Sequence, residues 1–231
     1  GSMSRYLFNL RHYLILEAEC AVSTGGRLGG VLDYTLQQFA YNAVLRRYPE
    51  SRRDEALSYV HVCQIYNYEE LWPEGDERLS VKDIICAQTH FITLKSAIRQ
   101  TDSLITPQIY QAIGTQLYFG VPMHLTEQMV QLIQQYSHEP SDCDPDPLRE
   151  VAELHSGFIT LGGDSRTAEI ISFLHCLNLY TCPFFIHAEN SERYKAAVRN
   201  PEQLLELFRE EQDRYREETT PFVIDYDEDD I

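Results

Sequence analysis

Residues 5–22 read RYLFNLRHYLILEAECAV, and the spacing of their apolar side chains decides the fold class. Apolar residues recur at steps of three and four, which is the period of one face of an α-helix rather than the alternation of a strand. The members of this face are Tyr6, Leu7, Leu10, Tyr13, Leu14 and Ala18. The run Ser23-Thr24-Gly25-Gly26 then ends the predicted helix.

The same period continues along most of the chain. It predicts helices over residues 30–48, 54–71, 81–99, 107–119, 125–136, 148–155, 165–177 and 200–217. Residues 182–186, Cys-Pro-Phe-Phe-Ile, are the one stretch that we expect to be extended. The sequence therefore predicts an all-α protein, a multi-helix bundle of about ten helical segments.

Capping signals mark several helix starts. Thr106-Pro107 and Asn200-Pro201 each place a capping side chain before a proline, which tolerates the first helical position. Asp164 or Ser165 can cap the helix that follows Gly162-Gly163. Ser80 and Asp83 resemble a capping box before the helix at residue 81.

The domain organisation is predicted from loops and composition. Gly1-Ser2 before Met3 resembles the remnant of a cleaved tag. The loop 138–147 separates an N-terminal helical region, residues 3–137, from a C-terminal helical region, residues 148–218, and the two either fold separately or form one continuous domain. Residues 219–231 are predicted to be a flexible acidic tail.

Cysteine usage and hydropathy indicate the compartment. The six cysteines form no C-x-x-C pair, and the N-terminus has no secretory apolar region. No apolar run approaches the roughly 20 residues that a membrane helix needs. We therefore expect an intracellular protein, cytoplasmic or nuclear, that does not span a membrane.

The formal charge of −17 is unevenly distributed. Residues 217–231 carry −7 and residues 139–153 carry −5, which leaves an ordinary charge on the remaining chain. No cluster of Lys and Arg is suited to a phosphate backbone, so nucleic acid is not expected as a partner.

The sharpest motif is residues 158–165, Phe-Ile-Thr-Leu-Gly-Gly-Asp-Ser. It resembles the F-x-x-L-G-G-D-S signature of acyl and peptidyl carrier domains, and the resemblance covers about residues 124–200. It implies a phosphopantetheine attached to Ser165, with Gly162, Gly163 and Asp164 forming the turn before it. A serine at a helix N-terminus also suits a phosphodiester, because the helix dipole favours negative charge there. Arg166 departs from the signature, which usually has an apolar residue at this position. The alternative interpretation is a plain turn with an N-cap.

Other candidate sites are predicted to be structural. Gly25–Gly30 lacks the Lys-Ser/Thr and the spacing of a phosphate loop, so we expect a turn. The candidate metal ligands Cys176, Cys182 and His187, with His155 or His175, lack short ligand spacing, and no metal is expected. No hydrolase motif is present, and the sequence does not indicate an enzyme.

The C-terminal tail combines apolar and acidic residues. Residues 221–230 read PFVIDYDEDD and resemble short SUMO-interacting motifs, in which a β-prone core adds as a strand to a sheet edge. The implied docking residues are Phe222, Val223, Ile224, Asp225, Tyr226, Asp227 and Glu228. Such a segment suits a partner protein with a basic surface, and the alternative is a solubilising tail.

These observations give two hypotheses for function. The first is a helical protein-protein interaction or regulatory protein that uses the acidic tail as a docking segment and needs no cofactor. The alternative is a phosphopantetheine-dependent carrier-like module with Ser165 as the attachment site. The sequence gives neither the identity of a partner nor the oligomeric state.

Overall fold

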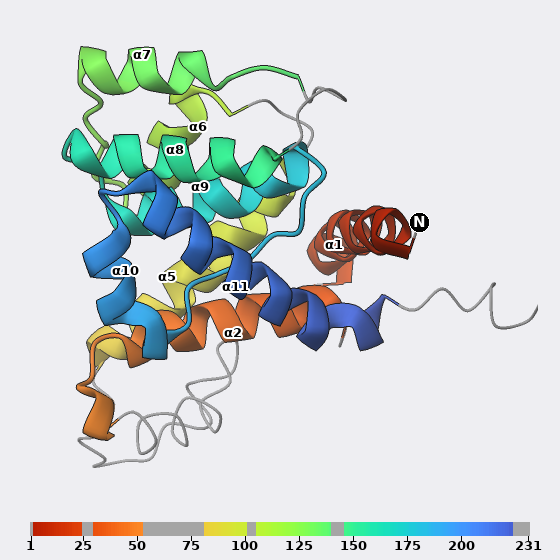
Figure 1. Ribbon diagram of the computed structural model, residues 1–231. Coiled ribbons are helices and arrows are strands. Elements are labelled where there is room, and N and C mark those ends of the chain that lie inside the picture. Colours follow the sequence, from red (N-terminus) through yellow and green to blue (C-terminus); the bar gives the residue numbers. More distant parts are fainter. Residues whose placement is uncertain (1, 25–29, 53–80, 101–104, 140–145, 224–231) are drawn as a thin grey trace, which may run out of the picture.

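The regular structure is helical throughout the described part of the chain, which confirms the all-α prediction. A computed structural model describes residues 2–24, 30–52, 81–100, 105–139 and 146–223 (Figure 1). Its α-helices are α1 (Ser2–Thr24), α2 (Val31–Leu45), α5 (Val81–Ile98), α6 (Pro107–Leu117), α7 (Glu127–Gln135), α8 (Pro147–Thr160), α9 (Ser165–Asn178), α10 (Ser191–Ala197) and α11 (Pro201–Thr219). Short 3-10 helices cover Glu50–Arg52, Ala188–Asn190 and Thr220–Phe222. None of the helices in these ranges is long and apolar enough to cross a membrane.

Predicted caps begin three of these helices. The Thr106 hydroxyl accepts a hydrogen bond from the Ile109 amide at 3.3 Å, and the Asp164 carboxylate accepts one from the Thr167 amide at 2.8 Å. The Asn200 side chain accepts from the first-turn amides of α11. These bonds satisfy amides that have no partner within the helix.

Some boundaries and elements differ from the prediction. Helix α8 continues to Thr160, well beyond the predicted end at residue 155, and α10 was not predicted. The predicted helix over residues 54–71, Ser80 of the capping box and most of the Gly25–Gly30 turn lie outside the described residues.

The helices form layers around a shared interior (Figure 1). Helices α2 and α5 pack along each other, α9 contacts both α6 and α8, and α11 lies across α8. Helix α7 covers α8 at one end of the molecule, and α1 packs on α2 and α5 at one side. The end capped by α7 contains the candidate site described below.

A single hydrophobic cluster joins the two predicted regions of the chain. It contains fully buried side chains from α1, α2, α5, α9 and α11, among them Leu14, Leu36, Leu94, Phe173 and Tyr215. A second cluster fills the space between α8 and α11, where the rings of Phe184 and Phe208 lie 4.3 Å apart. Residues 3–137 and 148–218 therefore share a core.

Residues 182–188 form a buried segment in which only Ala188, the first residue of a 3-10 helix, belongs to a regular element. Side chains from the surrounding helices bond its backbone: the Ile186 amide donates to Glu169 at 2.8 Å, and the Ala188 amide donates to Asn42 at 2.8 Å. The His187 amide donates to Glu211 at 2.6 Å. Buried peptide groups need such partners, and here α2, α9 and α11 supply them.

An ion pair holds the same segment, with the Glu169 side chain 5% exposed and the Arg46 side chain 25% exposed. The Arg46 guanidinium donates to both carboxylate oxygens of Glu169 at 2.7 and 2.8 Å and also to the Ile186 carbonyl. Burial opposes ionisation of Glu169, but the neighbouring guanidinium outweighs it and lowers the pKa of this carboxyl. The pair connects the end of α2 to α9.

The folded part of the chain continues into the predicted tail. Thr219 is fully buried, and its hydroxyl lies 2.6 Å from that of Tyr6. Val223 is only 5% exposed within the main cluster, and the Phe222 ring lies 5.2 Å from that of Tyr34. The folded region thus extends to Val223 rather than ending at residue 218, because Thr219 and Phe222 contact tyrosines of α1 and α2 and Val223 belongs to the main hydrophobic cluster.

Candidate functional site

The first glycine of the Phe158–Ser165 motif ends α8. The Gly163 amide donates to the Phe158 carbonyl at 2.9 Å, and the Gly162 amide donates to the Ile159 carbonyl at 2.9 Å. These two bonds are those of a Schellman motif, which requires a left-handed residue after the helix. Gly162 adopts this conformation with φ +97°, which explains why a glycine occupies this position.

The second glycine allows a close approach to an aromatic ring. A Cβ atom on Gly163 would lie 2.4 Å from ring carbons of Phe158. Phe158 is buried, and its ring centroid lies 4.8 Å from that of Tyr110. Gly163 therefore lets the turn lie directly on the Phe158 ring.

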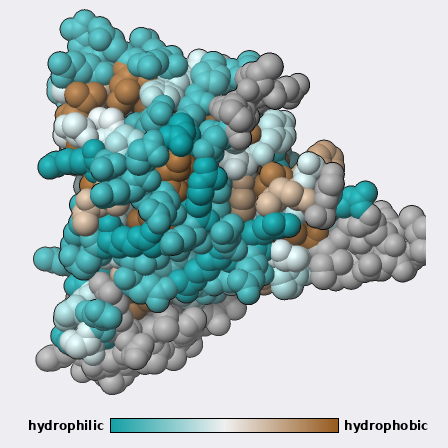
Figure 2. All heavy atoms as spheres, in the orientation of Figure 1, coloured by the Kyte–Doolittle hydropathy of each residue, from teal (hydrophilic) through white to brown (hydrophobic). Residues whose placement is uncertain are grey.

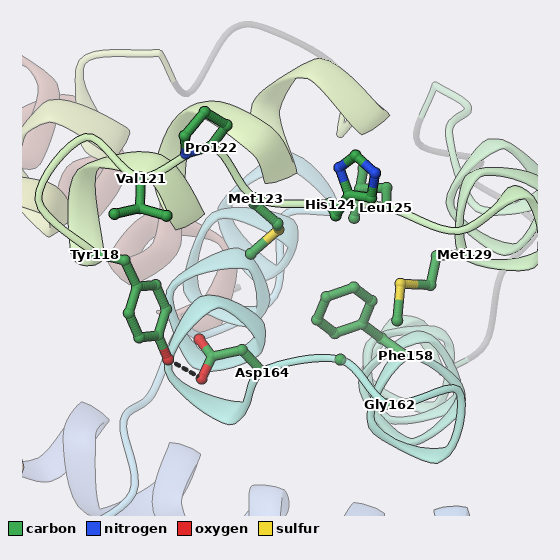
Figure 3. A pocket seen from close by; sticks show the side chains of 11 residues that line it. Tyr118, Val121, Pro122, Met123, His124, Leu125, Met129, Phe158, Gly162 and Asp164 are labelled. Carbon is green, nitrogen blue, oxygen red and sulfur yellow. Dashed lines mark hydrogen bonds between the residues drawn. The ribbon is translucent and has the colours of Figure 1, made fainter.

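Asp164 connects this turn to α9 and to the end of α6. One carboxylate oxygen accepts hydrogen bonds from the Thr167 amide at 2.8 Å and the Thr167 hydroxyl at 2.9 Å. The other accepts a hydrogen bond from the Tyr118 hydroxyl (Figure 3). Burial and this hydrogen bond raise the pKa of Tyr118 to about 12, so the phenol remains a donor at neutral pH.

Ser165 is the first residue of α9 and is exposed to solvent. This is the placement that the carrier resemblance implies for an attachment serine. The turn-and-cap interpretation also accounts for Gly162, Gly163 and Asp164, so these three residues do not distinguish the two interpretations.

A pocket of about 350 Å³ opens beside this turn (Figure 3). Its lining comes from the α6–α7 connection, the start of α7, the end of α8 and the turn before α9. The lining residues are Tyr118, Val121, Pro122, Met123, His124, Leu125, Met129, Phe158, Gly162, Gly163 and Asp164. Most of this surface is apolar, and the polar groups are Asp164, Tyr118 and His124.

The inner wall of the pocket consists of aromatic and thioether side chains. Met123 and Met129 lie on either side of Phe158 (Figure 3). A Cβ atom on Gly114 of α6 would lie 2.0 Å from the Met123 methyl carbon, so that glycine makes room for the methionine. Methionine side chains are flexible and adapt to differently shaped apolar groups. The wall is therefore suited to an apolar side chain or ligand group.

The rim of the pocket exposes apolar side chains. Of the lining residues, Val121 is 64% exposed and Tyr118 is 38% exposed; Phe119, which follows Tyr118 in the chain but does not itself line the pocket, is 71% exposed. Figure 2 shows hydrophobic atoms at the upper left, in the region of α7 and α8. Exposed apolar surface next to a pocket is typical of binding sites.

The backbone at Phe119 is strained. Phe119 follows the last turn of α6 with φ +59°, and the Gly120 amide donates to the Thr115 carbonyl at 2.8 Å. A left-handed conformation costs a residue with a side chain about 1–2 kcal/mol. With this backbone conformation the large apolar side chain of Phe119 points outward and is mostly exposed.

The connection after Phe119 has free backbone groups. The Val121 amide donates to the Tyr118 carbonyl at 3.2 Å, and the Met123 amide donates to the Thr115 hydroxyl at 3.4 Å. In the described part of the chain the amides of His124 and Leu125 have no hydrogen-bond partner. Both amides remain available to a bound molecule.

Other polar clusters belong to the core. His155 lies 2.7 Å from the Ser172 hydroxyl and 2.6 Å from the Tyr194 hydroxyl. Burial lowers the pKa of His155 to about 4, and Ser172 is also buried. A substrate cannot reach this serine without opening the helix packing, so the cluster stabilises the fold.

The candidate metal ligands do not come together. Among residues the structure describes, no group of three or more His, Cys, Asp or Glu side chains is arranged to hold a metal ion. Cys176 and Cys182 are buried thiols whose pKa values burial raises. His187 instead pairs with Glu211 at 3.1 Å.

The predicted docking residues of the tail divide at Val223. Phe222 is 40% exposed beside Tyr34, and Val223 is buried, so the side chain of Val223 is not available to a partner in this conformation. Ile224, Asp225, Tyr226, Asp227 and Glu228 lie outside the described residues.

Comparisons with family models and with curated proteins find no match for this chain. Its function is therefore argued from the site itself. Sequence reasoning identified Gly162, Gly163 and Asp164 but missed the α6–α7 side of the pocket. The available signal was the apolar run Tyr118–Leu125, which is interrupted only by Gly120 and His124.

Proposed function

We propose that this chain is a protein-interaction module that docks a partner on the α6–α7 connection. The observation that carries the proposal is the open pocket of about 350 Å³ beneath an exposed apolar rim. Phe119 and Val121 expose most of their surface, although most other phenylalanine and valine side chains of the described fold are buried. A partner that buries these side chains would gain favourable hydrophobic free energy of binding.

The dimensions of the site support recognition of a small anchor. Pockets that enclose whole ligands have volumes of about 300–1,000 Å³, and this one lies at the lower end of that range. Such a pocket accommodates one or two apolar side chains of a partner, while the rim packs against the residues that flank them. Interfaces of this kind gain most of their affinity from a few central anchors.

The acidic tail is a second docking element in this proposal. Since Val223 belongs to the core, strand addition by the tail would begin at Ile224 and continue through Glu228. The acids at 225, 227 and 228 suit a basic partner surface. This proposal extends the SUMO-interacting resemblance to the residues that follow the folded region.

A peptide-display selection on the full chain tests the docking site. We expect selected peptides to bind the native protein and to lose binding to a Phe119→Asn, Val121→Ser double variant. Asparagine tolerates the left-handed conformation, and both positions are exposed, so the variant should fold normally.

The matched control is Leu16→Ser, which removes an apolar side chain of 44% exposure from α1. Peptides that bind all three proteins equally would refute docking at the α6–α7 connection. Failure to select any peptide above background would refute it as well.

A carrier-like function of Ser165 is the second candidate. The observation that favours it is the exposure of Ser165 at the first position of the 14-residue helix α9. Phosphopantetheine would be held by the serine oxygen, and it would supply a thiol for acyl attachment. Coexpression with a broad phosphopantetheinyl transferase should then add the mass of one arm, and Ser165→Ala should abolish the gain. An unchanged mass would remove this candidate.

A further inference from the structure

We infer that the pocket recognises an extended peptide in which a large apolar residue lies two positions from a lysine or arginine. The apolar side chain enters the pocket, and the basic group pairs with Asp164. This inference rests on the proposed docking function and names the chemistry of its partner.

The apolar part of the preference follows from the inner wall. Met123, Met129 and Phe158 surround the pocket interior, and Leu125 adds an aliphatic group (Figure 3). The flexible thioethers fit aromatic and long aliphatic residues alike, whereas an alanine would leave the interior unfilled. Phenylalanine, leucine and methionine are the expected anchors.

The basic part follows from the charge of the lining. Asp164 is the one carboxylate among the lining residues, and no lysine or arginine lines the pocket. Its described partners are the neutral donors Tyr118 and Thr167. Carboxylate oxygens accept more than one hydrogen bond, so a peptide cation would add a charge-assisted bond to an existing, positioned acceptor.

The position of Asp164 fixes the spacing of the two peptide groups. Asp164 lies at the edge of the pocket, next to Tyr118, while Phe158 lies at its interior (Figure 3). In an extended peptide, side chains two positions apart lie on the same face, so a basic residue two positions from the anchor is directed toward this edge.

The extended conformation follows from the backbone of the connection. The amides of His124 and Leu125 face no partner within the described residues, and Pro122 has no amide hydrogen. An extended peptide presents carbonyl groups at a spacing that suits such free donors, as in strand-addition complexes. A free small amine would satisfy Asp164 but would leave the amides and the exposed rim uncovered.

Calorimetric titration of the full chain with capped octapeptides tests the inference. The test peptide is Ser-Gly-Val-Phe-Ser-Lys-Gly-Ser, and two analogues replace its lysine by glutamine or its phenylalanine by alanine. The peptides are named below by the residues at these two positions. We expect the Phe-Lys peptide to bind about tenfold more tightly than the Phe-Gln peptide at low salt. The Ala-Lys peptide should not bind measurably.

Asp164→Asn should remove the preference for lysine. Asparagine retains one oxygen that can accept from the Thr167 amide, and its NH2 group can donate to the Tyr118 hydroxyl oxygen, so the cap of α9 should persist. The matched control is Glu192→Gln, which removes one exposed negative charge from α10. The control should keep the tenfold preference, and added salt should reduce it in the native protein and in the control alike.

Each outcome distinguishes the inference from the docking function on which it rests. Equal binding of the Phe-Lys and Phe-Gln peptides, or an unchanged preference in Asp164→Asn, would overturn the inference. Absence of binding by the Phe-Lys peptide would overturn it too. Binding of phenethylamine as tight as that of the peptide would show a small-molecule site instead. The docking function itself fails only if the Phe119→Asn, Val121→Ser variant binds library-selected peptides normally or if no peptide is selected.

Discussion

Replacement of Gly163 by alanine tests why the motif contains a second glycine. The new Cβ atom would lie 2.4 Å from the Phe158 ring, which is buried and packed against Tyr110. The ring cannot move away without displacing its neighbours. Overpacking of this kind costs about 1–3 kcal/mol, and the loss of unfolded-state entropy returns about 0.4–1 kcal/mol.

The net effect should be a loss of about 1–2 kcal/mol in the free energy of unfolding. For a chain of this size the loss lowers the Tm by about 2–8 °C. Thermal unfolding followed by circular dichroism measures it. The altered Phe158 ring should also weaken binding at the pocket, because Phe158 forms part of its inner wall.

Gly162→Ala is the matched comparison. A Cβ atom there meets nothing within 4 Å, and its cost of about 1–2 kcal/mol comes from the left-handed backbone alone. Phe158→Leu removes the ring that a Cβ atom on residue 163 would meet. In a double-mutant cycle it should reduce the cost of Gly163→Ala by about 1 kcal/mol and leave the cost of Gly162→Ala unchanged. Equal coupling in the two cycles would refute the explanation by ring contact.

Three further predictions concern buried groups. The ring nitrogens of His175 have no hydrogen-bond partner among the described residues, and burial, followed by the charge of His138, lowers its pKa to about 4. In the unfolded state this histidine has a pKa of about 6.5 and binds a proton more readily, so the free energy of unfolding should fall as the pH drops from about 6.5 to 4. In urea unfolding, His175→Leu should reduce the loss of stability between pH 7 and pH 5 by up to about 2 kcal/mol. Arg46→Met should cost about 3–5 kcal/mol by leaving Glu169 buried and unpaired, and adding Glu169→Leu should restore part of the lost stability in the same assay. Val223→Ala should cost about 1–2 kcal/mol by calorimetry, and deletion of residues 219–231 should lower the Tm as well; an unchanged Tm would show that the end of the folded region contributes nothing.

The helices could be predicted because their signals are local. The start of α9 follows from Asp164 and the start of α11 from Asn200-Pro201, since a cap and the amides that it bonds lie within three residues. The end of α8 was predicted too early, although Gly162 marks the observed end. The short helix α10 has a weak apolar period of its own and forms against α11.

The pocket and the end of the folded chain could not be predicted in this way. The pocket combines residues around 118–129 with residues 158–164, and no spacing rule relates these two segments. Val223 stands in a sequence that resembles a flexible tail, but it is buried in a hydrophobic cluster that also contains side chains from α1 and α2, far earlier in the chain. The Gly162–Asp164 turn was the part of the site with a local signature.

The buried segment 182–188 has a consequence for how the protein opens. Its amides at Ile186, His187 and Ala188 are held by side chains from α9, α11 and α2, so an opening of any one of these helices releases a different amide. In hydrogen-deuterium exchange these three amides should be protected as strongly as helical amides, although Ile186 and His187 belong to no regular element. The segment therefore links the three helices, because separation of any one of them from it leaves a buried amide without its partner.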